Sequence, residues 1–322
     1  MRKLHNYEIS HLLIAVALTS CLPAQTQGWR NAWEARNTAG TEAYHQQNYT
    51  VAIQEFRAAA SEAEKDQSKE AKQCLAATLT NLGEVYTETK QYTRAASALT
   101  RAAELWRASA GPNDVNYAVA LRDIAILKED QKQYLEAERL FRQALSINQR
   151  AFGAQHSSTT MVMYDLALLY RQEGKALAAM DMFQQAMKLD EARGPSGALD
   201  VASVSNNLAE LYFSQKRYGE AESLYKRALQ IRESMLGPDH PDVAVVLSNL
   251  AATYDKLKRF RETEELLKRA LRIDERALGP ESNEVAQDLE TLAAFYQDRG
   301  KTREAMTLRD RAAQIRARRN RK

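Results

Sequence analysis

The sequence repeats a pattern of small and apolar residues every 42 positions over most of its 322 residues. The first column of the pattern holds Gly83, Ala125, Ala167, Ala209, Ala251 and Ala293. The second column holds Ala95, Ala137, Ala179, Ala221, Thr263 and Ala305. A third, apolar column holds Leu99, Phe141, Phe183, Tyr225 and Leu267, and it ends in Arg309. A fixed period of this length is typical of a chain built from stacked repeats, each of which contacts its neighbours.

Each repeat has the pattern of two helices joined by a short polar turn. Leu208, Ala209 and Tyr212 fall on one face of a helix with a 3.6-residue period, and Ala221 and Tyr225 fall on one face of the next. Antiparallel helices joined by so short a turn pack closely only where side chains are small, which explains the two Gly/Ala columns. Gly-Pro pairs follow several of the second helices and are typical helix stops.

The repeats occupy most of the chain. Residues 72–317 hold six copies, and residues 30–71 hold a weaker copy with the same spacing of Gly40, Tyr49 and Phe56. Only 12 Gly and 6 Pro occur, and strong helix formers dominate. The predicted fold class is therefore all-α, a solenoid of about seven helical hairpins. Arg309 replaces the apolar residue that would face a further repeat, so the sixth copy is expected to end the stack.

These columns resemble the tetratricopeptide repeat, and the 42-residue period resembles its kinesin light chain type. The segments that carry the resemblance read AESLYKRAL at 221–229, GPDHPDVA at 237–244 and LSNLA at 247–251. The resemblance implies a right-handed α-solenoid whose first helices line a concave groove that binds peptides. The resemblance therefore implies a protein-binding function and does not identify the partner.

No pattern of catalytic residues accompanies the repeats. The histidines that follow the N-terminal segment are His45, His156 and His240, and the last two lie two periods apart in turns between repeats. This spacing predicts a structural role in the turn. The metal and phosphate motifs HExxH, paired CxxC and GxxxxGK[ST] do not occur. The sequence predicts that the protein is not an enzyme and uses no cofactor and no metal.

One polar stripe beside the first small column is the candidate partner-binding surface. Asparagine both donates and accepts hydrogen bonds, which suits an extended peptide backbone. Acidic residues toward the N-terminal repeats favour a basic or neutral partner segment, although ordinary solvated positions are an equally open interpretation. Glu222, outside the columns, is expected on a solvated face. The candidate residues are Asn81, Glu84, Asp123, Asp165, Asn207, Glu210 and Asn249.

Residues 1–21 have the pattern of a bacterial lipoprotein signal. Arg2 and Lys3 precede a short apolar run, which ends in Leu18-Thr19-Ser20-Cys21. This four-residue pattern resembles the lipobox, which implies that Cys21 carries the lipid anchor and that the protein is held at the bacterial cell envelope. Residues 22–29 are then a linker. The alternatives are a soluble secreted or periplasmic protein, and a cytosolic adaptor whose apolar N-terminus is not cleaved.

The charge balance is even overall and uneven along the chain. The formal net charge is +3, but the segment from Arg316 to Lys322 carries five of the positive charges, so the charge of the body of the chain argues against nucleic acid as a partner. Residues 318–322 form a basic tail. The expected partner is another protein or a peptide segment, with the membrane contacted only through the lipid anchor; the sequence has no signal for an oligomeric state.

Overall fold

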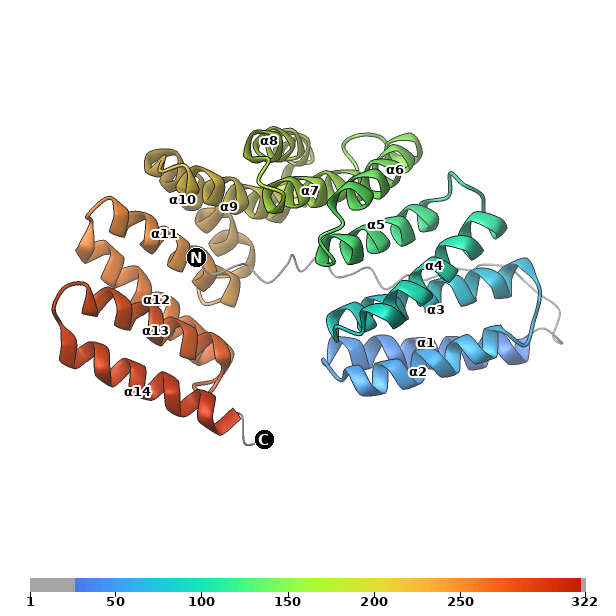
Figure 1. Ribbon diagram of the computed structural model, residues 1–322, viewed down its shortest axis with the longest axis horizontal. Coiled ribbons are helices and arrows are strands. Elements are labelled where there is room, and N and C mark those ends of the chain that lie inside the picture. The colour runs from blue at the N-terminus through green and yellow to red at the C-terminus, as the bar shows by residue number, and fades with distance from the viewer. Residues whose placement is uncertain (1–26, 320–322) are drawn as a thin grey trace. The chain divides into compact units, whose positions relative to one another are not determined.

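The computed structural model describes residues 27–319, and every regular element in that range is a helix (Figure 1). The elements are α1 Gln27–His45, α2 Tyr49–Ala63, α3 Lys69–Glu88, α4 Tyr92–Ser109, α5 Val115–Asp130, α6 Tyr134–Phe152, α7 Ser157–Gln172, α8 Ala176–Ala192, the short 3-10 helix η2 Gly194–Gly197, α9 Ala198–Ser214, α10 Tyr218–Leu236, α11 Pro241–Lys256, α12 Phe260–Ala277, α13 Asn283–Gln297 and α14 Thr302–Arg319. Cys21 and the rest of the predicted signal lie outside the described residues.

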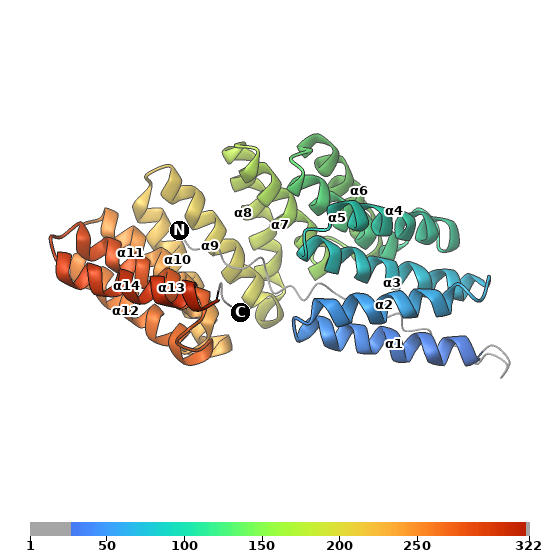
Figure 2. The same ribbon diagram turned by 60° about the horizontal axis from the view of Figure 1, so that its bottom comes forward.

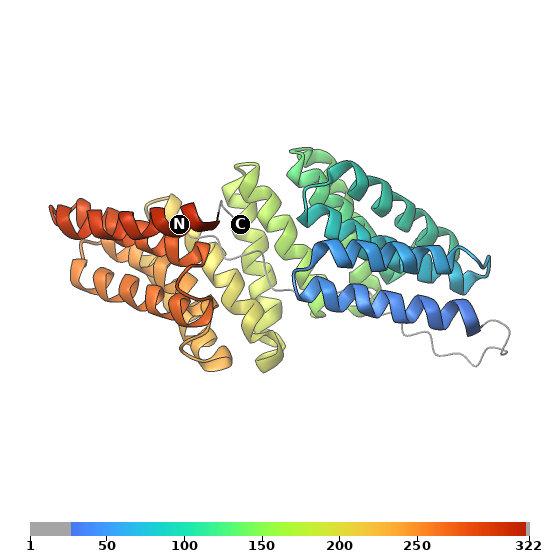
Figure 3. The ribbon, with the colours of Figure 1, turned by 90° about the horizontal axis from the view of Figure 1, so that it is seen from below.

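The chain forms two compact units. The N-terminal unit ends at Met182 and the C-terminal unit begins at Phe183, so α8 contributes to both. In the N-terminal unit α1 packs against α2, and α2 against α3, as Figure 2 shows in blue. In the C-terminal unit α9 pairs with α10, α11 with α12, and α13 with α14, the pair drawn in red in Figure 3. The predicted fold class, an all-α solenoid of tetratricopeptide-type hairpins, is confirmed.

The small columns lie where the two helices of a hairpin meet. Ala125, Ala209 and Ala251 are fully buried in the first column. At Gly83 an added Cβ would lie against Cγ and Cδ2 of Leu99, well inside van der Waals contact. Leu99 is itself fully buried and cannot move aside freely. The close approach inferred from the sequence is therefore confirmed at the atoms that make it.

The turn inside each hairpin repeats one backbone conformation. The short turn between the two helices contains one residue with positive φ, which is Gln47, Lys90, Lys132, Gly174, Lys216, Lys258 or Gly300. Five of these residues are not glycine, although left-handed backbone favours glycine. The turn can be this short because the residue with positive φ helps to reverse the direction of the chain.

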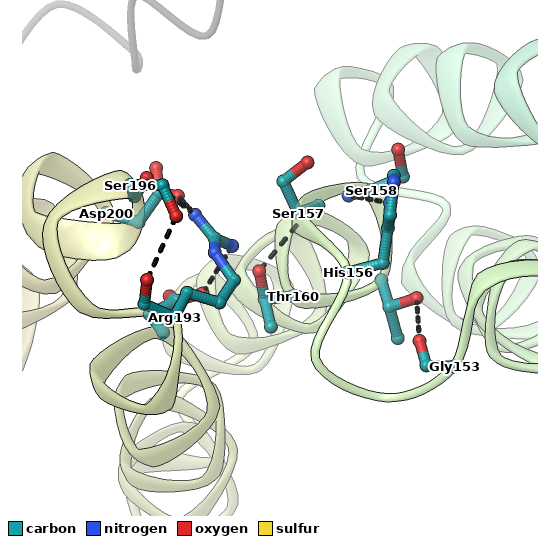
Figure 4. A network of polar contacts seen from close by, with 10 residues as sticks. Gly153, His156, Ser157, Ser158, Thr160, Arg193, Ser196 and Asp200 are labelled. Carbon is teal, nitrogen blue, oxygen red and sulfur yellow. Dashed lines mark hydrogen bonds and ion pairs between the residues drawn. The ribbon is translucent and has the colours of Figure 1, made fainter.

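The turns between repeats are capped by side chains. The Nδ1 atoms of His156 and His240 each accept a hydrogen bond, at 3.2 Å, from the backbone N–H two residues on. Both histidines are N-caps of first helices, which confirms their predicted structural role. Figure 4 shows the His156 turn and, separately, the turn after α8, where η2 replaces the cap and Arg193 pairs with Asp200.

The last hairpin has a polar outer surface. Arg309 is exposed on α14, as predicted for the end of the stack. Arg316 and Arg318, from the basic C-terminal segment, pair with Glu290 and Glu281 at 2.7 and 2.8 Å. None of the helices between residues 27 and 319 combines the length and apolarity needed to cross a membrane.

Candidate protein-binding surface on the first helices

The predicted partner-binding stripe is not exposed, and this corrects the sequence analysis. Glu210 is half-buried, and the other six residues of the stripe are buried. Asn81 and Asn249 have no exposed surface, and Asp165, the most exposed of the six, retains 7%. The reason is that the stripe faces the first helix of the neighbouring repeat. Asn81, Asp165 and Asn249 each contact a polar side chain on that neighbouring helix.

A repeated contact joins successive first helices at this stripe. In the N-terminal unit, Nε of Arg122 on α5 donates to Oδ2 of Asp165 on α7 at 2.5 Å. In the C-terminal unit, Nδ2 of Asn249 on α11 donates to Oδ1 of Asn206 on α9 at 3.1 Å. Both pairs are 43 residues apart, so they occupy equivalent places in the repeat. Sequence reasoning missed Arg122 and Asn206, although each stands one position before a stripe residue in the same 42-residue register.

The N-terminal end of the stripe carries a related contact. Asn81 on α3 donates from Nδ2 to Oδ1 of Asn37 on α1 at 3.4 Å. Thr78 Oγ1 donates to the same oxygen at 3.3 Å and accepts from Nε1 of Trp33 at 2.8 Å. These bonds tie the weak first hairpin to the second.

Carboxylates gather beside the Arg122–Asp165 pair. Glu84 on α3 and Asp123 on α5 are buried, and Nη1 of Arg122 lies 3.8 Å from Oδ1 of Asp123. Burial raises the pKa of Asp123 to about 7, with Asp165 adding to the shift and Arg122 opposing it. Burial and the Asp123 charge hold the pKa of Glu84 well above its usual range. Ionised carboxylates are therefore disfavoured here unless a cation joins them.

Amides occupy the stripe in the C-terminal unit. Asn207 donates from Nδ2 to the backbone oxygen of Ser203 at 3.0 Å, and Asn206 donates to Glu210 at 3.4 Å. Oδ1 of Asn249 and Oγ of Ser248 are enclosed and have no hydrogen-bond partner within the described residues. Buried polar atoms are nearly always paired, so this α11 site has unused hydrogen-bonding capacity.

Glu222 corrects a second expectation, because it is not on a free solvated face. It pairs with Lys226 at 2.5 Å and with Arg259 at 2.8 Å, and Arg259 lies 3.8 Å from the centre of the Tyr254 ring. Glu264, one period later, pairs with Lys268 and accepts a hydrogen bond from the hydroxyl of Tyr296 at 2.9 Å. These clusters link one repeat to the next.

Two features within residues 27–319 bear on catalysis: the state of Cys74 and the arrangement of metal-ligating residue types. Burial raises the pKa of the Cys74 thiol to about 12, which keeps it protonated and unreactive. No group of three or more His, Cys, Asp or Glu side chains between residues 27 and 319 could hold a metal ion.

The chain belongs to the tetratricopeptide repeat family, whose model matches residues 74–148, 124–192 and 200–276. Folds of this family are generally non-catalytic interaction scaffolds. No curated protein sequence gives a significant match.

Solved structures share the fold at low sequence identity. The nearly identical repeats of a putative kinesin light chain from Podosopora anserina are 23% identical with a TM-score of 0.54, over 63% of this chain and 96% of that one. BtubC (BKLC) from P. vanneervenii is 23% identical with a TM-score of 0.61, over 79% and 93%. The Rap conjugation gene regulator of plasmid pLS20, in complex with the Phr* peptide, is 16% identical with a TM-score of 0.57, over 95% and 79%.

Proposed function

We propose that this protein is a non-catalytic scaffold of the bacterial cell envelope that binds an extended segment of another protein along the first helices of its repeats. Family membership supports the scaffold role, because stacked helical hairpins present equivalent side chains at regular intervals. A peptide complex is known for one protein of the same fold, the Rap regulator of plasmid pLS20.

One observation carries the binding proposal: the unpaired polar atoms on α11. Oδ1 of Asn249 is an acceptor and Oγ of Ser248 can donate or accept, and neither has a partner between residues 27 and 319. Ala252, one helical turn from both, is half-buried and is the nearest partly exposed position on this side of α11 that a label can occupy. A peptide backbone that supplies one N–H to the asparagine oxygen would complete this site.

Photo-crosslinking tests the site. A photoreactive phenylalanine analogue replaces Ala252 in one variant and the exposed second-helix residue Gln230 in a control, and both are irradiated in envelope extract. We expect a specific crosslink at 252, and mass spectrometry of that product identifies the bound segment. Crosslinking only at 230 would move the binding surface to the second helices.

A matched pair of variants then separates binding from stability. Asn206→Ala and Asn249→Ala both remove the same hydrogen bond between repeats, but only the second removes the unpaired oxygen. We expect both to lower stability, and Asn249→Ala alone to weaken binding of the identified segment, by ~0.5–1.5 kcal/mol. Equal affinity in the two variants would remove Asn249 from the binding site.

The envelope location rests on Cys21 and its sequence context. Mass spectrometry of the mature protein is expected to show a diacylglyceryl group on Cys21, and Cys21→Ser is expected to release the protein from membranes. An intact Met1 in a soluble fraction would instead favour a cytosolic adaptor.

A further inference from the structure

Three carboxylates share one guanidinium on the first helices of the N-terminal unit. Glu84, Asp123 and Asp165, here called the carboxylate cluster, are each more than nine-tenths buried, as is Arg122. Arg122 gives its Nε–H to Asp165 and lies at 3.8 Å from Asp123. Among the charges that shift the pKa of Asp123, Arg122 is the cation and Asp165 the opposing anion. The Arg122 guanidinium thus contacts two of these three buried carboxylates.

The geometry leaves an oxygen of Asp123 unused. Oδ2 of Asp123 is enclosed and accepts no hydrogen bond within the described residues. An ionised carboxylate buried without a full set of partners is strongly disfavoured, and a second cation would supply both the charge and the missing donor. The unused oxygen therefore indicates what the cluster lacks: a positively charged hydrogen-bond donor.

The surroundings of the cluster suit a guanidinium or ammonium group. Glu88 is exposed one helical turn beyond Glu84 on α3, where it can attract a cation from solvent. On α1, burial and the charges of Glu84 and Glu88 raise the pKa of the half-buried Tyr44. Aromatic faces and carboxylates together bind arginine better than lysine, because the guanidinium is planar and can stack as well as donate.

We propose that the carboxylate cluster binds a basic side chain of the partner segment, with arginine preferred to lysine. This inference rests on the proposed function, because it assigns one side chain of the same partner to the N-terminal unit. The proposal specifies a positive charge on the partner segment where that segment meets the carboxylate cluster. The unpaired atoms on α11 specify hydrogen bonds but no charge.

Titration of the full-length protein with a model peptide tests the proposal. The probe is an acetylated and amidated six-residue peptide of alternating Gly and Arg, and its control has citrulline, the neutral isostere, in place of Arg. We expect the Arg peptide to bind and the citrulline peptide to bind at least ~10-fold more weakly. Asp123→Asn is expected to lower the affinity for the Arg peptide ~10-fold. Glu104→Gln, which removes an exposed carboxylate from α4, is expected to leave its affinity unchanged.

Proton release gives a second readout that diffuse attraction would not produce. Because the pKa of Asp123 is about 7, a bound cation favours its ionised form, and binding at pH 7 should release protons. Calorimetry in two buffers of different ionisation enthalpy measures this. If Asp123→Asn fails to fold, Glu84→Gln replaces it, and the citrulline comparison on the unaltered chain still decides.

Three outcomes would overturn the proposal: no binding of the Arg peptide, equal binding of the citrulline peptide, or equal loss in Asp123→Asn and Glu104→Gln. In each case the carboxylate cluster would only stabilise the contact between first helices and would not bind a basic side chain. The scaffold proposal would stand in all three, because crosslinking at position 252 in the C-terminal unit tests it independently.

Discussion

The two compact units place different chemistry at the same contact between first helices. In the N-terminal unit the contact is an ion pair, Arg122 with Asp165, with the Asp123 carboxylate beside it. In the C-terminal unit it is an amide pair, Asn206 with Asn249. Both pairs are 43 residues apart. The repeat therefore fixes where the side chains meet and leaves their charge free to vary.

This freedom has a physical basis in the way a solenoid is built. Each repeat packs only against its neighbours, so each contact need satisfy only its own two helices. A neutral amide pair loses one modest hydrogen bond when a member is removed. A buried ion pair loses its balance of charge, because the remaining ion stays enclosed without a partner. The two units are thus expected to respond differently to equivalent substitutions.

The largest expected effect comes from removing Arg122. Arg122→Met leaves Asp165 and its neighbours buried without their cation, and should lower the free energy of unfolding of the N-terminal unit by ~3–5 kcal/mol at pH 8. Asn206→Ala, at the equivalent place, should lower that of the C-terminal unit by only ~0.5–1.5 kcal/mol. Urea denaturation followed by circular dichroism measures both.

A double variant sharpens this result. Converting the ion pair into the amide pair, with Arg122→Asn and Asp165→Asn together, should recover most of the stability lost by Arg122→Met. A double variant as unstable as the single one would show that the charge of the pair is not what matters.

The next effect concerns the small column, where Gly83 stands in the N-terminal unit and Ala209 in the C-terminal unit. Helix propensity alone predicts that Gly83→Ala stabilises the protein by ~1 kcal/mol. The contact with Leu99 predicts the opposite, a loss of ~1–3 kcal/mol from overpacking. Thermal melts decide the sign, and a gain would mean that the helices can separate at this point.

The two units should also depend on pH in opposite directions. The pKa of Asp123 is raised to about 7, so its contribution to stability is present below pH 4 and is lost as the pH rises through 7. Bonds from Lys268, Tyr296 and Lys301 lower the pKa of Glu264 to about 2, so its contribution is present above pH 4.5 and is lost as the pH falls toward 2. Hydrogen exchange of the N-terminal unit at pH 5 and pH 8, and of the C-terminal unit at pH 5 and pH 3, measures the two trends.

Variants assign these trends to their carboxylates. Asp123→Asn should stabilise the N-terminal unit more at pH 8 than at pH 4. Glu264→Gln should destabilise the C-terminal unit by ~1 kcal/mol at pH 7 and by less at pH 3. If stability depended on pH in the same way in both units, and the substitutions did not change that dependence, the assignment would be wrong.

The smallest effect lies in the hairpin turns. Lys132 in the N-terminal unit and Lys216 in the C-terminal unit both have positive φ, and Gly174 and Gly300 occupy the same place in other repeats. Replacing either lysine by Gly should raise stability by up to ~1 kcal/mol, because glycine adopts this backbone without strain. Equal gains would show that the turns, unlike the first-helix contacts, are energetically alike in the two units.

The sequence by itself determined the architecture of this protein. The 42-residue period, the small columns and the places of His156 and His240 in turns between repeats are local patterns, because they depend on helix geometry and on the packing of two adjacent helices. Each could be recognised without knowledge of where one repeat lies against the next. For the same reason Arg309 could be assigned to the outer surface of the last hairpin.

Only the tertiary structure decided which polar side chains are buried. Asn249 and Asp165 have the spacing of a solvated stripe, yet they face Asn206 and Arg122 of the preceding repeat. Glu222 likewise meets Arg259 from the following repeat. A polar residue on a helix has the same periodicity whether its neighbour is water or another polar side chain. Its burial depends on how the repeats stack, and that geometry is set by contacts between residues more than 30 positions apart.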